Sequence, residues 1–275
     1  MNEDEGTIPI TADGLMVLRS DPALTSEAGI EDPFAAWFVT EAGRQLAQIA
    51  LSIDPVYAIY NLARYRRFGA LLARASQEFT QIVMLGAGYD TRAIWMQELR
   101  EKRPRVFEVD VAATLATKAH VLAAHDVIMP ETIVQVPADL NRDDLLAALR
   151  SCGFNEAVPS FVMAEGVTFF LDAQTVDKLL SPSMLGLAPG SLLAFDFWNH
   201  ARLARLNEQV FAARGIRIFK PFPLPDSPDP LRAALLSRGF HTALVEPLEN
   251  IARAVWPPAR SWTPDPGWFL VEAKV

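Results

Sequence analysis

The sequence of 275 residues has almost no means of forming covalent or metal cross-links, because it contains a single cysteine, Cys152. One cysteine forms no internal disulfide and is too few for a cysteine-based zinc site. We therefore expect no metal centre and no internal disulfide. The apolar fraction of 51% and the charged fraction of 21% exclude a disordered chain and indicate a globular protein with a large core.

Positive charge is scarce. The chain carries 25 Lys and Arg residues against 33 Asp and Glu residues, for a formal net charge of −8 at pH 7. Proteins that bind nucleic acid grip its phosphates with a surplus of positive charge. The composition therefore predicts no nucleic-acid partner.

Long hydrophobic runs are also missing. The longest uncharged stretch, Leu179–Phe195, is interrupted by Pro182, Gly186, Pro189 and Gly190, so it is no membrane span. The acidic start over residues 1–6 lacks the basic region of a signal peptide. We expect a soluble, cytoplasmic protein without a membrane partner, and the sequence leaves its oligomeric state open.

The first eighty residues contain no strand signal. Apolar residues recur at three- and four-residue spacing in Leu15–Leu24, Pro33–Leu51 and Pro55–Ala75. Pro33 and Pro55 each follow an aspartate, which is typical of a first-turn proline after an N-cap. Residues 1–80 are therefore expected to form a helical cap.

From Gln81 onward, short apolar strands alternate with helices, which is typical of a parallel sheet covered on both faces. The expected strands are Gln81–Leu85, Arg105–Asp110, Thr132–Val136, Ser160–Ala164 and Ser191–Trp198. The helices expected between them are Thr91–Arg100, Ala112–Ala124, Arg142–Ser151 and Ala173–Leu187. After a helix at Asp229–Arg238, the strands His241–Pro247 and Gly267–Val275 are expected to close the sheet as an antiparallel edge hairpin. We interpret 1–275 as one domain whose α/β core spans 81–275.

The turn containing Gly86 and Gly88 joins the first strand to a helix, which lets a ligand approach the backbone at the carboxyl edge of the sheet. A tight turn without a ligand is the alternative. Thr91 replaces the third glycine of the dinucleotide pattern, and Asp90 places a carboxylate where a pyrophosphate would sit. A ligand with an amine and a sulfonium suits this turn, so S-adenosylmethionine is favoured over NAD.

Two later segments carry further candidate cofactor contacts. Asp110 ends the second strand, where a carboxylate accepts hydrogen bonds from both ribose hydroxyls, although it also suits a helix N-cap. Asp139 and Leu140 follow the third strand. There they are placed to accept from an adenine amino group and to pack on the ring.

These segments together resemble the leucine carboxyl methyltransferase family, including its bacterial O-methyltransferase members, from about Glu31 to the end of the chain. The resemblance rests on Asp32-Pro33-Phe34, Ala63-Arg64-Tyr65-Arg66, Leu85-Gly86-Ala87-Gly88-Tyr89-Asp90-Thr91-Arg92, Phe107-Glu108-Val109-Asp110 with Lys118, Ala138-Asp139-Leu140 and Ala164-Glu165-Gly166-Val167.

The resemblance implies a class I methyltransferase (Rossmann-like) sheet with added N-terminal helices over the cofactor. It implies that Arg64 binds the methionine carboxylate, that Glu165 lies beside the methionine end, and that Arg19 is the nearest match to an earlier basic residue. The other cofactor contacts would be Gly86, Gly88, Asp90, Asp110, Asp139 and Leu140. The chain departs from the family at Gly69, where bacterial members often have an acidic residue, which puts the partner of Arg66 in question.

His200 follows the fifth strand at its carboxyl end, so it is the candidate for a substrate contact or a general base, with a loop histidine as the alternative. We therefore interpret the chain as an S-adenosylmethionine-dependent O-methyltransferase. Its expected acceptor is a carboxyl or hydroxyl group of a small molecule, plausibly in secondary metabolism. The alternatives are a protein C-terminal carboxyl methyltransferase, a nicotinamide-dependent oxidoreductase, and a catalytically silent S-adenosylmethionine-binding protein.

Overall fold

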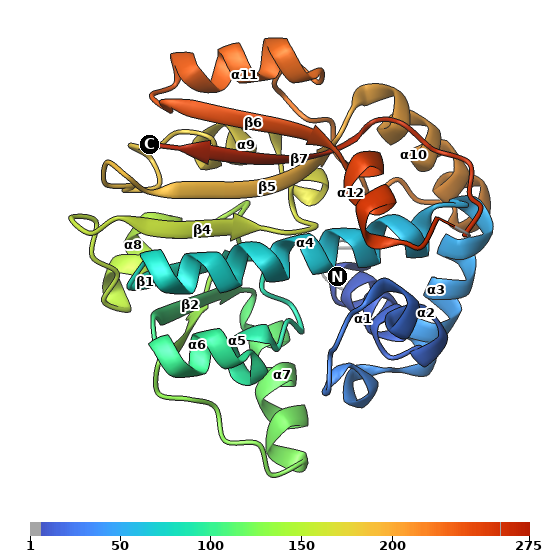
Figure 1. The fold of residues 1–275 in the computed structure, drawn as a ribbon, viewed down its shortest axis with the longest axis horizontal. Helices are drawn as coiled ribbons and strands as arrows, with labels where there is room; N and C mark the ends of the chain where they lie inside the picture. Colours follow the sequence, from blue (N-terminus) through green and yellow to red (C-terminus); the bar gives the residue numbers. More distant parts are fainter. Residues whose placement is uncertain (1–6, 259) are drawn as a thin grey trace.

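The computed structural model describes residues 7–258 and 260–275, and its strands form one seven-stranded sheet. The acidic start over residues 1–6 lies outside the described residues. The strands are β1 (Gln81–Leu85), β2 (Arg105–Asp110), β3 (Ile133–Pro137), β4 (Ser160–Ala164), β5 (Leu192–Trp198), β6 (Thr242–Pro247) and β7 (Trp268–Lys274). They follow the order β3-β2-β1-β4-β5-β7-β6 (Figure 1).

The sheet is parallel from β3 through β5 and antiparallel at its C-terminal edge. The predicted strands are confirmed, three of them residue for residue, because each is a short apolar run between clear helix or turn signals. The last two strands form the expected antiparallel pair, in which β7 lies between β5 and β6.

Alternate residues of each central strand belong to two separate hydrophobic cores. In β1, Ile82 and Met84 pack into the core that includes the N-terminal helices, whereas Val83 and Leu85 pack into the core on the opposite face. This alternation follows from strand geometry, because successive side chains point to opposite faces of a sheet. Burial on both faces explains why these strands read as continuous apolar runs.

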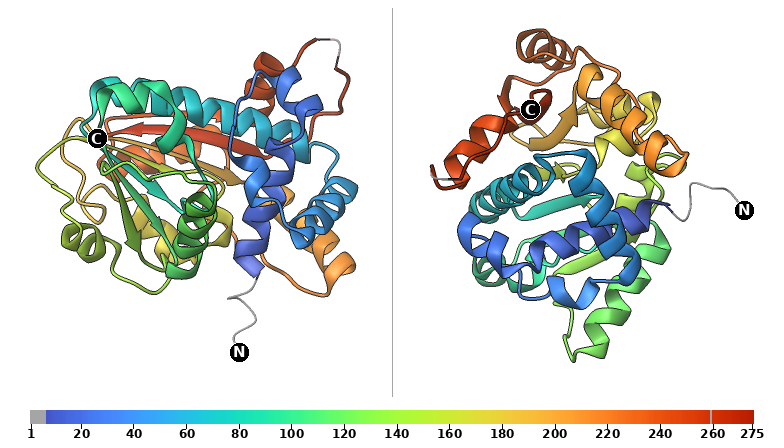
Figure 2. Two further views of the ribbon diagram at one scale, coloured as in Figure 1. Left: turned by 90° about the horizontal axis from the view of Figure 1, so that it is seen from below. Right: turned by 90° about the vertical axis from the view of Figure 1, so that its right-hand side faces the viewer.

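The N-terminal helices gather beyond one end of the sheet, while α4 crosses one face of it (Figures 1 and 2). The N-terminal elements are α1 (Thr7–Arg19), α2 (Pro22–Ala28), the 3-10 helix η1 (Ala35–Phe38), α3 (Glu41–Ile53) and α4 (Tyr57–Glu78). The later ones are α5 (Arg92–Trp95), α6 (Gln97–Lys102), α7 (Ala112–Ala124), α8 (Leu145–Ser151), η2 (Thr168–Phe170), α9 (Ala173–Leu179), α10 (His200–Arg214), α11 (Pro228–Ser237) and α12 (Leu248–Val255). In the described part of the chain, no helix has the length and apolar character needed to cross a membrane.

Two of the predicted N-terminal helices are broken by local caps. Leu15–Leu24 spans the end of α1 and the start of α2, because Asp21 caps Pro22 and accepts a hydrogen bond from the Ala23 N–H at 2.9 Å. Within Pro33–Leu51 the chain forms η1 and then α3, whose N-cap is Thr40.

The prediction that Asp32 caps a helix is wrong, because its carboxylate accepts from the Tyr65 hydroxyl at 3.0 Å and lies in a tertiary contact. The third predicted helix, Pro55–Ala75, begins two residues later than expected, as α4, and extends to Glu78.

Three later helices also differ from expectation. Thr91–Arg100 is interrupted at Met96, whose extended backbone ends α5 and precedes α6. The helix expected over Ala173–Leu187 ends at Leu179, and α8 begins only at Leu145, where Asp144 supplies the N-cap. The helices α10 and α12 were not anticipated. Most of their buried apolar residues belong to the core that includes the N-terminal helices.

We predict that Gly267→Ala lowers the free energy of unfolding much more than Gly215→Ala. Both glycines have positive φ, at 102° and 72°, so any side chain there costs about 1–2 kcal/mol of backbone strain. At Gly267 an added Cβ would also lie 2.3 Å from Oδ1 of Asn199, the residue that caps α10, whereas nothing lies within 4 Å at Gly215.

Urea unfolding is the measurement, with an expected loss of about 3 kcal/mol for Gly267→Ala and about 1 kcal/mol for Gly215→Ala. Equal losses in the two variants would contradict the packing described around Asn199.

Candidate functional site

A cavity of about 230 Å³ lies at the carboxyl ends of the parallel strands, beneath α1 and α4. From α1, the residues Ala12, Leu15, Met16 and Arg19 line it, at the spacing of one helix face. In an open parallel sheet the carboxyl ends of the strands are the usual place for a ligand. All eight sequence-predicted cofactor residues line this cavity, namely Arg64, Gly86, Gly88, Asp90, Asp110, Asp139, Leu140 and Glu165.

The glycine turn after β1 is shaped by close backbone packing. Gly86 has a φ of 61°, and a Cβ at this position would lie 2.5 Å from Val167 Cγ2, so no side chain fits without a shift. The Gly88 N–H donates to Asp110 Oδ2 at 2.8 Å, which ties the turn to the end of β2. The backbone of the turn therefore forms part of the cavity wall.

Asp110 is held in place by backbone donors on both carboxylate oxygens. Oδ2 accepts from Gly88, and Oδ1 accepts from the Val111 N–H at 2.8 Å. Burial raises the pKa of this carboxyl, and the two backbone hydrogen bonds oppose that rise. The Thr114 side chain also hydrogen-bonds to this carboxylate, and since its two oxygens have four lone pairs, Asp110 retains capacity for one further donor from a ligand.

Asp139 and Leu140 follow β3 and line the same cavity. Asp139 Oδ1 accepts from the Asn141 N–H at 2.9 Å, and Oδ2 lies 3.5 Å from Arg142 Nε. About a third of the Asp139 side chain stays exposed, so its carboxylate remains accessible to a donor.

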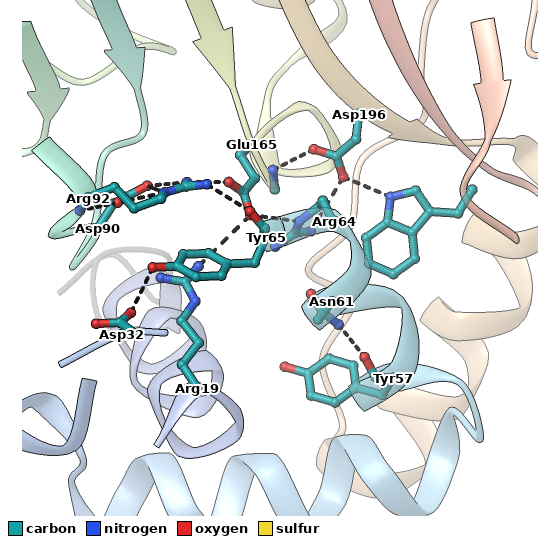
Figure 3. Close-up of polar contacts among 12 residues, drawn as sticks. Arg19, Asp32, Tyr57, Asn61, Arg64, Tyr65, Asp90, Arg92, Glu165 and Asp196 are labelled. Atoms are coloured by element: carbon teal, nitrogen blue, oxygen red, sulfur yellow. Dashed lines mark hydrogen bonds and ion pairs between the residues drawn. The ribbon is translucent and has the colours of Figure 1, made fainter. Parts of the chain in front are cut away.

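A buried charge cluster occupies the centre of the site (Figure 3). The guanidinium of Arg92, 1% exposed, forms ion pairs with Asp90 and Glu165 and donates to the Tyr65 carbonyl. Burial opposes ionisation of Asp90, but the adjacent Arg92 outweighs it and lowers the pKa of Asp90 to about 2. For Glu165, burial is likewise outweighed by Arg92 and Arg64, and its pKa is lowered.

Arg64 continues this cluster toward β5. Its Nε donates to Glu165 Oε1 at 3.2 Å and its Nη1 to Asp196 Oδ2 at 3.4 Å. Asp196 also accepts from the Gly166 N–H and the Trp268 indole. Among the described residues Arg64 Nη2 has no hydrogen-bond partner, and Arg64 lines the cavity.

Arg19 reaches the same cluster from α1. Its guanidinium lies 4.0 Å from Glu165 Oε1 and 4.0 Å from the centroid of the Tyr65 ring. The described residues offer it no closer anion, so it presents a second cation to the cavity beside Arg64.

The departure at Gly69 concerns a different arginine from the one expected. Arg66 Nη1 donates to the Ala28 carbonyl at 2.8 Å and keeps this partner without an acid at 69. A Cβ on Gly69 would instead point toward Arg92, at 3.9 Å from its Cδ. The charge of Arg92 is already balanced by Asp90 and Glu165, so Arg92 does not depend on an acid at position 69.

The structure does not place His200 in the cavity. His200 is the first residue of α10, and its side chain is 59% exposed. Its Nδ1 lies 2.8 Å from Asp226 Oδ2, and the backbone N–H donates to the same oxygen. This exposed position agrees with the alternative that His200 is a loop histidine. We therefore do not propose His200 as a general base.

Among the cavity residues that were not identified as site candidates from sequence, Tyr57, Asn61 and Phe219 bear on the chemistry. Tyr57 and Asn61 lie on the same face of α4 as Arg64, and Phe219 comes from the chain after α10. The spacing of 57, 61 and 64 is that of one helix face, so extending the pattern from Arg64 would have found the first two. Trp198, at the end of β5, also lines the cavity, whereas Trp256 donates to the Ile59 carbonyl within the core.

The fold is shared with solved structures. A protein of Streptomyces avermitilis from the duf574 family superposes with a TM-score of 0.58 at 16% identity, covering 96% of this chain and 99% of that one. A protein of Thermobifida fusca described as a "putative methyltransferase" superposes with a TM-score of 0.57 at 21% identity, covering 95% of this chain and 97% of that one. The predicted class I methyltransferase-like sheet with N-terminal helices is confirmed.

The family model described as leucine carboxyl methyltransferase matches residues 17–184, and the chain belongs to this family. A relative from Mycobacteroides abscessus, named "Putative S-adenosyl-L-methionine-dependent methyltransferase", is 34% identical over 206 residues. That match covers 68% of this chain and 64% of the relative, so the chain spans less than two thirds of that protein. A relative of the same name from Mycolicibacterium paratuberculosis is 28% identical over 282 residues, and that match covers 90% of this chain and 88% of the relative.

We predict that Asp90→Asn destabilises the protein at neutral pH by about 2 kcal/mol, and that the loss shrinks in acid. The pKa of Asp90 is 3.8 when unperturbed and about 2 in the folded protein. A lowered pKa stabilises the fold above pH 3.8, and that contribution is lost as the pH falls from 3.8 through 2.

Urea unfolding of both proteins at pH 7, 5 and 3 measures this difference. A difference that stays constant over the three pH values would show that Asp90 is not held ionised by Arg92.

Proposed function

We propose that the protein is an S-adenosylmethionine-dependent O-methyltransferase acting on a small molecule. The observation that carries the proposal is the arrangement of charge in the cavity. Arg64 presents an unpartnered Nη2 to it, and Asp110 presents a carboxylate with remaining acceptor capacity. A cation for a carboxylate and a carboxylate for a diol are complementary to the amino-acid and ribose parts of this cofactor.

The cavity residues divide by the part of the cofactor that each suits. Arg64 and Arg19 would bind the methionine carboxylate, and Glu165 would face the amine. Asp110 would hold the ribose, and Asp139 with Leu140 the adenine. Gly86 and Gly88 would let the backbone approach the ligand, while Asp90 disfavours a phosphate at the same turn. The bound cofactor supplies an activated methyl group, and the protein's part is to align an acceptor with it.

A nicotinamide-dependent oxidoreductase is disfavoured by the same cluster. The pyrophosphate of a dinucleotide binds at the first helix N-terminus after the glycine turn. Here that position has the buried Asp90 carboxylate, which Arg92 keeps ionised. Family membership supports the methyltransferase in addition.

The lining of the cavity supports a carboxylate acceptor over a hydroxyl. Of the described residues that line it, none is a histidine. Asp90 and Glu165 are paired with arginines, Asp110 and Asp139 are the residues assigned to the cofactor, and burial raises the pKa of the Tyr57 phenol to about 12. A carboxylate is already ionised at pH 7 and needs no base, whereas a hydroxyl does.

We predict that Asp110→Ala weakens S-adenosylmethionine binding roughly 30- to 150-fold, because a charged contact to two hydroxyls is lost. Calorimetry measures the affinity, and circular dichroism checks the fold. Asp177→Ala is the matched control, since Asp177 pairs with Arg238 on the surface and does not line the cavity. Unchanged affinity in a folded Asp110→Ala protein would remove Asp110 from the site.

We also predict methyl transfer to small carboxylic acids, measured as release of S-adenosylhomocysteine with labelled cofactor. For an acid with a pKa near 4, the rate should be flat between pH 6 and 8, because the acceptor stays ionised; for a phenol it should rise about tenfold per pH unit. His200→Ala should retain the wild-type rate within about twofold.

The acceptors tested in this assay also include phenols and a peptide with a free C-terminal carboxylate. Transfer confined to phenols, with a loss of rate in His200→Ala, would contradict the carboxylate assignment. Cofactor binding without transfer to any acceptor would instead favour the catalytically silent alternative.

A further inference from the structure

The cavity-facing side of α4 carries two polar groups that the cofactor contacts above do not use. Tyr57, Asn61 and Arg64 follow one another at helical spacing and all line the cavity. Asn61 is 5% exposed, and its Nδ2 donates one hydrogen to the Tyr57 carbonyl at 2.8 Å. Among the described residues its Oδ1 has no partner, and neither has the Tyr57 hydroxyl.

Asn61 is buried and Tyr57 is half-buried, and the second Nδ2 hydrogen of Asn61 and the Tyr57 hydroxyl are available to a ligand in the cavity. In native proteins such groups are nearly always satisfied by protein, water or ligand. Figure 3 shows Asn61 and Tyr57 on α4 on the side of the helix that faces the space beside Arg19. Because the Tyr57 phenol stays protonated at physiological pH, its hydroxyl acts as a donor. The pair thus offers an O–H donor and an amide N–H donor to a ligand.

The wall beyond Arg64 is aromatic. The Arg64 guanidinium lies 5.2 Å from the Trp268 ring, whose centroid is 5.4 Å from that of Trp198. Trp198 stacks on Phe169 at 4.2 Å with an interplanar angle of 17°, and Phe219 meets it edge-on at 4.6 Å. Flat rings of this kind bind a flat apolar molecule well and offer few partners to the amide groups of a peptide.

We propose that this part of the cavity is the acceptor subsite, and that the acceptor is a small aromatic monocarboxylate. The Tyr57 hydroxyl and the Asn61 amide hold its carboxylate, while Phe169, Trp198 and Phe219 hold its ring. The inference rests on the proposed function and names its substrate class. In the reaction one carboxylate oxygen forms a bond to the methyl carbon as the methyl–sulfur bond breaks. The bonding electron pair stays on sulfur, a neutral ester results, and no proton is transferred.

The first test measures binding by calorimetry to the full chain saturated with S-adenosylhomocysteine. The probes are benzoate, phenylacetate and 1-naphthoate, compared with acetate and with a peptide that ends in leucine. At least one aromatic acid should bind more tightly than acetate and the peptide. Tyr57→Phe should weaken that acid roughly tenfold or more, because a hydrogen bond to a charged group is lost.

Tyr60→Phe is the matched control, because Tyr60 lies on the same helix but accepts from the Asp265 N–H outside the cavity lining. It should leave the affinity for the aromatic acid unchanged. Both variants should bind S-adenosylhomocysteine like the wild type. If Tyr57→Phe lowered the affinities for S-adenosylhomocysteine and for the aromatic acid equally, Tyr57 would lie at the cofactor and the inference would be overturned.

Asn61→Asp provides a second, charge-specific test. A carboxylate at position 61 should repel phenylacetate. The affinity for phenylacetate should therefore fall roughly tenfold more than the affinity for phenylacetamide, a neutral ligand of the same shape. An equal effect on the two ligands would show that Asn61 does not face the acceptor carboxylate.

Two further outcomes separate this inference from the proposed function. If the protein binds S-adenosylhomocysteine but none of the aromatic acids, or prefers the peptide, the acceptor assignment is overturned and cofactor binding still stands. If it binds neither S-adenosylmethionine nor S-adenosylhomocysteine, the proposed function itself fails.

Discussion

The guanidinium of Arg92 balances two buried carboxylates, Asp90 and Glu165, and the geometry of the site depends on this contact. Asp90 belongs to the turn after β1, and Glu165 follows β4, so one cation joins two neighbouring strand ends. Arg92 also donates to the Tyr65 carbonyl of α4, which brings the covering helix into the same unit. Removing one partner from such a cluster leaves an unbalanced buried charge, which destabilises the folded protein.

The cluster extends through Arg64 to Asp196 and the Trp268 indole, and so from the glycine turn to the antiparallel edge of the sheet. This continuity has a chemical consequence. The carboxylates at the centre are committed to arginines, so they orient groups and balance charge rather than taking protons. Arg64 contributes to the cluster through Nε and Nη1 and keeps Nη2 for the cavity, which makes it both a structural and a candidate binding residue.

A second buried network fixes the aromatic wall. The Arg202 side chain has no exposed surface and pairs with Asp54 at 2.6 Å and with Asp265. Its guanidinium lies 5.5 Å from the Trp198 ring and 5.1 Å from the Trp268 ring. Since Asp54 precedes α4 and Asp265 precedes β7, this arginine holds the two tryptophans against the helix that carries Tyr57 and Asn61. The two networks thus support opposite ends of one cavity.

The sequence by itself determined the elements whose signals are local. Continuous apolar runs predicted β1, β2 and β4 residue for residue, and the glycine turn with Asp110 predicted the edge of the sheet at which the cavity lies. Tertiary structure decided what local signals do not contain. Asp32 looks like a helix cap, but the Tyr65 hydroxyl holds it in a tertiary contact. His200 follows a strand at the correct edge, yet the direction of α10 and the Asp226 carboxylate keep its ring outside the cavity lining. Tyr57 and Asn61 lie far from the glycine turn in sequence. They line the cavity because α4 packs across the sheet, and packing, rather than residue type, decides which face of a helix meets a cavity.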